Sequence, residues 1–134
     1  SCPNVNKCLE RTQLFTFINP KRQWCIIKLS PFADIKLVDR YYKQGFRQFH
    51  CSNTIPVEEG GLSGTSIVPY TSQLLKTIKS KYSDVEIIAG GGIYDIGVYN
   101  KYKNLGANHY SISTIFLHPI TFSYFIYSFY NDKL

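Results

Sequence analysis

Short apolar runs alternate with longer amphipathic stretches along this chain, and the alternation predicts strands and helices in turn. Runs rich in branched and aromatic residues predict strands at 24–29, 46–51, 85–90 and 107–113. The first of these, "WCIIKL", is continuous, which is typical of a strand buried on both faces. Helical spacing predicts helices at roughly 7–17, 34–44, 70–82, 95–105 and 117–130. In the fourth of these, Asp95 is a candidate N-cap, and Tyr102 lies at helical spacing on the apolar face. The segment 52–69, rich in Gly, Ser, Thr and Pro, predicts a loop.

The order of these elements predicts an α/β fold with a parallel sheet, because consecutive parallel strands are joined by right-handed helical crossovers. Four such units make either a small doubly wound sheet or half of an eight-unit barrel, which needs about 250 residues. The chain has 134 residues and no methionine, so we expect a processed chain or part of a longer protein. We therefore interpret 1–134 as one partial domain, the C-terminal half of a TIM (β/α)8 barrel with the upstream half missing.

The charge balance favours a site for small anions over a nucleic-acid surface. The chain carries 15 Lys and Arg against 9 Asp and Glu, a net charge of +6, but its basic residues are dispersed over the predicted helix faces. The aromatic segment 117–130 is too short and too often interrupted by polar residues to span a membrane. We expect neither a nucleic-acid nor a membrane partner.

The titratable residues give no sign of a metal site. The cysteines at 2, 8, 25 and 51 contain no C-x-x-C pair, and Cys25 lies in an apolar run. We expect reduced cysteines, no bound metal and a cytoplasmic location. His50, His109 and His118 have no carboxylate at a fixed offset, and we interpret them as structural.

Polar and glycine-rich segments follow the end of every predicted strand. They are Lys28–Pro31, Ser52–Thr54, Gly90–Gly92 and Ser113–Thr114. The carboxyl ends of parallel barrel strands share one rim, where active sites form. A strand, a glycine turn and a helix start also present backbone N–H groups to a phosphate, and a tight turn alone is the alternative role for such glycines.

An ordered set of short motifs resembles the dihydroorotate dehydrogenases, which are FMN-dependent (β/α)8 barrels of pyrimidine biosynthesis. The motifs are "SCPN" (1–4), "IKLSP" (27–31), "SNT" (52–54), "GGLSG" followed by Pro69, "IIAGGGI" (87–93) and "SISTIF" (111–116). The resemblance runs through essentially the whole chain and matches the second half of the barrel.

The resemblance implies a role for each matching residue. Cys2 would be the base that takes a proton from C5 of dihydroorotate, and a Cys at this position is typical of the soluble branch. Lys28 would lie beside the N1/O2 edge of the flavin. The substrate would be bound by Asn4, Asn53 and Thr54. FMN would be held mainly by Ser63, Gly64, Gly91, Gly92, Ser113 and Thr114.

The sequence therefore predicts FMN-dependent oxidation of dihydroorotate to orotate in de novo UMP biosynthesis. One alternative is another FMN barrel enzyme that acts on a pyrimidine ring. A second is a non-catalytic half-barrel that binds phosphate ligands or self-associates through exposed sheet edges. The electron acceptor stays open, and both a homodimer and an electron-transfer partner subunit fit the sequence.

Overall fold

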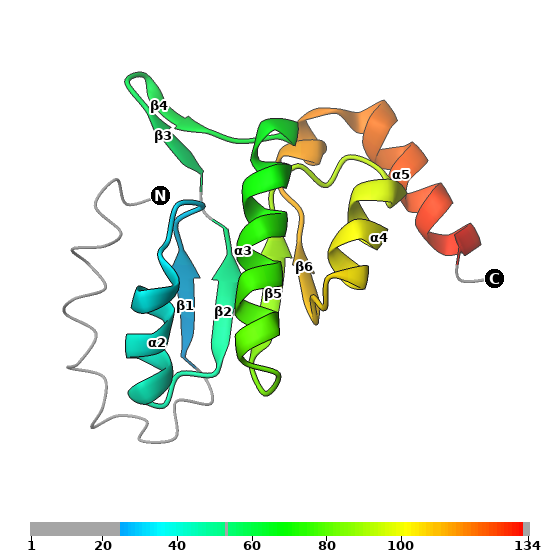
Figure 1. Cartoon of the computed structure of the whole chain (residues 1–134). Helices are drawn as coiled ribbons and strands as arrows, with labels where there is room; N and C mark the ends of the chain where they lie inside the picture. Colours follow the sequence, from blue (N-terminus) through cyan, green and yellow to red (C-terminus); the bar gives the residue numbers. More distant parts are fainter. Residues whose placement is uncertain (1–24, 53, 133–134) are drawn as a thin grey trace.

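The computed structural model describes residues 25–52 and 54–132 and shows alternating strands and helices (Figure 1). In chain order the elements are β1 (Ile26–Leu29), α2 (Ile35–Lys43), β2 (Gln48–Cys51), β3 (Ile55–Val57), β4 (Gly60–Leu62), η2 (Thr65–Ile67), α3 (Val68–Lys81), β5 (Glu86–Gly90), α4 (Ile96–Asn104), β6 (His109–Ser111), η3 (Thr114–Leu117) and α5 (Pro119–Asp132). The predicted helix at 7–17 lies outside the described residues. The other predicted elements are present, most of them a few residues shorter than the sequence suggested.

The main sheet has the strand order β1-β2-β5-β6, and all its pairs are parallel. Each neighbouring pair is joined by a helix, α2, α3 or α4 in turn, so the predicted α/β class is confirmed. The strand order follows the chain, as in consecutive units of a (β/α) barrel. All four carboxyl ends therefore lie at the same edge of the sheet.

Helices α2, α3 and α4 cover one face of the main sheet, and α5 packs beside α4 (Figure 1). On that face Leu29, Phe49 and Ile87 are fully buried. They pack in one apolar core with side chains of the helices, including Val38, Leu75, Ile78 and Tyr102. Burial of this apolar area is the main source of stability, at about 25 cal/mol per Å² removed from water.

The expectation that the first strand is buried on both faces was wrong. In β1 the residues Ile27 and Leu29 are buried, whereas Ile26 is 51% exposed and Lys28 is also exposed. The same alternation continues in β2, where Phe49 is buried and its neighbours along the strand are not. The cause is that the described helices pack on one face only, which leaves the other face of the sheet open.

The segment predicted as a loop at 52–69 contains regular structure. Strands β3 and β4 form an antiparallel hairpin in which Ile55 pairs with Leu62, and η2 follows before α3 begins. Gly60 supplies a φ of 138° just after the hairpin turn, a conformation that L side chains rarely adopt. The glycines in this segment indicated a turn, but the short strands lack the alternation that identifies strands in a sequence.

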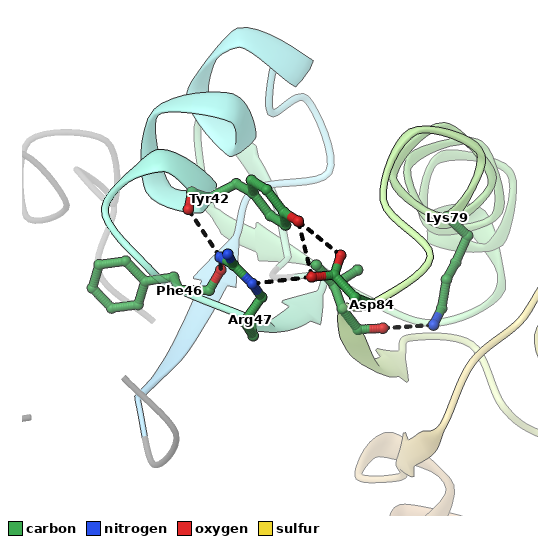
Figure 2. A network of polar contacts seen from close by, with 6 residues as sticks. Tyr42, Phe46, Arg47, Lys79 and Asp84 are labelled. Carbon is green, nitrogen blue, oxygen red and sulfur yellow. Dashed lines mark hydrogen bonds and ion pairs between the residues drawn. The ribbon is translucent and has the colours of Figure 1, made fainter. Parts of the chain in front are cut away.

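At the amino ends of the strands, a network of polar contacts links the segment between α2 and β2 to the segment between α3 and β5 (Figure 2). The Arg47 guanidinium donates to the carbonyl oxygens of Tyr42 and Phe46, both at 2.9 Å, and its Nε lies 3.2 Å from Oδ2 of Asp84. The Tyr42 hydroxyl also donates to Asp84, at 2.9 Å. In addition, Lys79 Nζ donates to the carbonyl oxygen of Val85 at 2.6 Å, which fastens α3 to the start of β5. This network lies at the end of the sheet opposite to the predicted site.

Candidate functional site

The glycine turn after β5 packs closely against the segment that leads into α3. Gly91 and Gly92 have φ values of 102° and 71°. A Cβ on Gly92 would stand 2.7 Å from the carbonyl oxygen of Gly64 and 2.5 Å from Cγ2 of Val68. A Cβ on Gly91 would collide with Ile67. Both the backbone conformation and the close approach therefore require glycine at this turn.

A second contact brings the segment after β6 to the same place. The Ser63 and Thr114 hydroxyl oxygens are 3.5 Å apart, although the residues are far apart in the sequence. Ser113, which precedes Thr114, is the residue before η3. The structure thus brings together three segments with predicted FMN contacts, which are 63–64, 91–92 and 113–114.

A buried hydroxyl pair holds the carboxyl ends of β2 and β5 together. The Ser52 and Thr71 hydroxyl oxygens are 2.8 Å apart, and Thr71 Oγ1 also donates to the carbonyl oxygen of Gly90 at 3.2 Å. Thr71 lies in α3 and is fully buried. Sequence analysis did not identify Thr71, because a single Thr in an amphipathic helix gives no signal of its role.

Tyr102 supports the glycine turn from the side of α4. Its hydroxyl donates to the carbonyl oxygen of Gly91 at 2.6 Å, and the residue is fully buried. Burial raises the pKa of Tyr102 to about 12, so the hydroxyl keeps its proton and acts as a donor throughout the neutral range. The helical spacing of Tyr102 indicated only a core position, because its hydrogen bond to Gly91 depends on how α4 packs against the turn after β5.

The start of α4 is already occupied by a carboxylate. Asp95 Oδ1 accepts from the backbone N–H of Val98 at 2.9 Å, which confirms Asp95 as the predicted N-cap. A negative charge at this position satisfies the amino end of the helix and disfavours a second anion there. The glycine turn and the two hydroxyls are therefore better placed to receive an anion than the α4 terminus itself.

The other predicted site residues lie elsewhere or outside the described part of the chain. Lys28 is on β1 and projects from the open face of the sheet. Thr54 follows β2 and packs on the hairpin, with its Oγ1 2.5 Å from the point where a Cβ on Gly61 would stand. Cys2, Asn4 and Asn53 fall outside the described residues.

The segments 63–64, 91–92 and 113–114 form one cluster, which we call the glycine cradle. Gly64 and Gly92 are buried against each other, whereas the Ser63 and Thr114 hydroxyls lie at an exposed contact and can donate to an anion. Among residues 25–52 and 54–132 no group of three or more His, Cys, Asp or Glu is placed to hold a metal ion. Within the same ranges, no helix combines the length and the apolar character needed to cross a membrane.

Solved structures of dihydroorotate dehydrogenase (DHODH) resemble this chain in fold. The crystal structure of DHODH from Eimeria tenella in complex with ferulenol has a TM-score of 0.64 and 21% identity, and the match covers 74% of this chain and 31% of that chain. The ligand-free form from the same organism gives 0.62 and 23%, covering 74% of this chain and 33% of that chain. No protein-family model and no curated protein sequence matches the chain. The chain thus shares the architecture of part of a TIM barrel and spans about a third of the DHODH chains it matches.

Proposed function

We propose that this chain forms part of an FMN-dependent enzyme that oxidises dihydroorotate to orotate in pyrimidine biosynthesis. The observation that carries the proposal is the glycine cradle, in which three segments with FMN-site motifs meet at the carboxyl edge of a parallel sheet. The likeness in fold to DHODH structures supports the same conclusion. Both arguments concern one part of a larger barrel, so the activity belongs to the whole enzyme.

The cradle would hold the FMN phosphate. The Ser63, Ser113 and Thr114 hydroxyls would supply donors to the phosphate beside the partly exposed Gly91, while the buried Gly64 and Gly92 hold the segments together. When bound, FMN supplies the hydride acceptor for C6 of the substrate. The Lys28 ammonium would lie near the edge of the flavin that gains negative charge, where it stabilises that charge electrostatically.

The substrate would be held and deprotonated by residues that the sequence places around the same rim. Asn4 and Asn53 offer both donors and acceptors to a planar imide and a carboxylate, and Thr54 adds a hydroxyl. Cys2 would remove the C5 proton as a thiolate, which an unperturbed thiol becomes only near pH 8.5. A cation near Cys2 would favour that form.

The phosphate role of the cradle can be tested with two ligands that differ only in that group. We expect the chain to bind FMN weakly, with a Kd on the order of 1 mM, because it supplies only part of the pocket. Flavin fluorescence should then show weaker binding for riboflavin, which lacks the phosphate. Gly92→Ala should weaken FMN binding, whereas Asp84→Asn, at the opposite end of the sheet, should leave it unchanged.

Two results would count against this proposal. Equal affinities for FMN and riboflavin would mean that the cradle does not hold the phosphate. Competition of inorganic phosphate with FMN, together with no effect of dihydroorotate on the flavin in the whole barrel, would favour a non-catalytic phosphate-binding half-barrel.

A further inference from the structure

The open face of the sheet carries a polar pair outside the glycine cradle. Lys28 of β1 and His50 of β2 are register partners on neighbouring parallel strands, so their side chains leave the sheet on the same face. Lys28 is exposed and His50 is half-buried. A cation and an imidazole therefore lie on a face that the described helices leave open.

Two small residues determine where the His50 ring lies. Its Nε2 is 3.0 Å from the point where a Cβ on Gly90 would stand, and Cβ of Ser111 is 3.1 Å from the same point. The imidazole of β2 thus lies across Gly90 of β5 and reaches toward β6. Gly90 immediately precedes the turn of the glycine cradle, so the ring lies close to the carboxyl edge of the sheet.

The next question is which described residues interact with the His50 imidazole. Within the described part of the chain, no hydrogen bond joins the imidazole to another residue. Glu86 of β5 is engaged by His109 of β6, with 3.5 Å between Oε2 and Nε2. Burial and the Lys28 ammonium both lower the pKa of His50, so the ring is neutral at pH 7.

We propose that His50 is a second ligand-contacting residue beside Lys28, and that together they bind the anionic edge of a planar ring. This inference rests on the proposed function, since FMN and orotate both offer such an edge. The neutral imidazole donates or accepts a hydrogen bond when the ligand arrives. The bound negative charge offsets the charge of Lys28 and so favours protonation of the free ring nitrogen.

The proposal makes ligand binding depend on pH in a fixed direction. An anion bound against the ring stabilises the imidazolium, so the pKa of His50 is higher in the complex than in the free chain. By linkage, lower pH must then strengthen binding. Each unit by which the ligand raises that pKa corresponds to about a tenfold gain in affinity between the alkaline and acidic limits.

NMR titration of the histidine imidazoles in the full chain tests this directly. His50, His109 and His118 each give separate ring signals, so the last two act as internal references. The titration is run between about pH 5 and pH 8, without ligand and with millimolar FMN or orotate. Lys28→Gln should raise the pKa of His50 in the free chain. His50→Gln should remove the pH dependence of orotate binding, and the matched control His118→Gln should keep it; orotate is the ligand for this comparison because the FMN phosphate itself titrates at about pH 6.

Comparison of the two ligands separates this inference from the proposed function. A rise in the His50 pKa with either ligand supports the inference, and the two ligands tell whether the flavin or the pyrimidine is the ring that binds. If FMN binds and the His50 signals do not move, His50 is not a ligand contact and the proposed function stands. If orotate moves His50 but FMN never binds, the FMN role fails alone. Binding of neither ligand would overturn both.

Discussion

Replacing Gly92 by alanine isolates the packing of the glycine cradle with a single methyl group. The new Cβ would stand 2.7 Å from the Gly64 carbonyl oxygen and 3.1 Å from Cα of Thr65, and both of these are backbone atoms. Backbone cannot rotate away as a long side chain can, so the two segments must separate. Gly60→Ala is a matched control, because Gly60 also has a positive φ, of 138°, but nothing lies within 4 Å of its added Cβ.

Two effects, backbone strain and steric overlap, destabilise Gly92→Ala, whereas backbone strain alone destabilises Gly60→Ala. An L residue at positive φ costs about 1–2 kcal/mol, and this term applies to both variants. Forcing a methyl into a packed site costs about 1–3 kcal/mol more, and this term applies to Gly92→Ala alone. We therefore expect a loss of about 2–5 kcal/mol in the free energy of unfolding for Gly92→Ala, against about 1–2 kcal/mol for Gly60→Ala. A domain of this size is stable by only about 5–15 kcal/mol, so the difference is large.

Thermal unfolding followed by circular dichroism measures both variants against the unmodified chain. At about 4 °C per kcal/mol, Gly92→Ala should lower Tm by about 8–20 °C and Gly60→Ala by about 4–8 °C. FMN affinity should fall in Gly92→Ala and stay unchanged in Gly60→Ala. Equal Tm losses would show that the cradle accommodates the methyl group, and the close approach of Gly92 to Gly64 would then not be a constraint.

Three further predictions concern the support and the chemistry of the site. Tyr102→Phe removes the donor to the Gly91 carbonyl and should destabilise the chain by about 1–3 kcal/mol in urea unfolding, since that oxygen is left without its partner; an unchanged midpoint would contradict the contact. The free energy of unfolding should fall as pH drops below about 6.5, because the pKa of His50 is lowered in the folded chain and the unfolded chain therefore binds a proton first. His50→Gln should reduce this dependence of stability on pH, and an unchanged dependence in the variant would refute the prediction. In the whole enzyme, Cys2→Ala should slow flavin reduction by dihydroorotate by about 10²- to 10⁴-fold with little change in orotate affinity, and a normal stopped-flow rate would exclude Cys2 as the base.

Local patterns predicted the order of the elements well, because burial on one side of a helix or strand leaves a clear periodic signal. Asp95 was recognisable as an N-cap from its place before an amphipathic stretch, and the structure confirms it. The hairpin at 55–62 was missed because each of its strands has only three residues, too few to show an alternation. The exposure of Ile26 was missed because an apolar run does not reveal how many faces of its sheet are covered.

The site was predictable as a set of segments but not as a set of contacts. Gly92 and Gly64 each gave a turn signal, yet their approach depends on how α3 and the β5 turn pack together. Thr71 and Tyr102 gave no functional signal, because their hydroxyls act on backbone carbonyls that only the fold brings near. A sequence motif identifies residues such as Gly92, whereas residues such as Thr71 and Tyr102 are identified only by their contacts in the folded chain.

His50 illustrates how strand register changes the interpretation of one residue. In the sequence it follows a buried Phe49 and has no carboxylate at a regular offset, which indicates a structural role. The parallel register places it opposite Lys28, and the missing side chain of Gly90 gives its ring room to lie across β5. A large residue at position 90 would force the imidazole away from the edge of the sheet. Gly90 would then serve the site through the space it leaves for His50, and Gly90→Ala should disturb the His50 signals even though Gly90 is not at the turn itself.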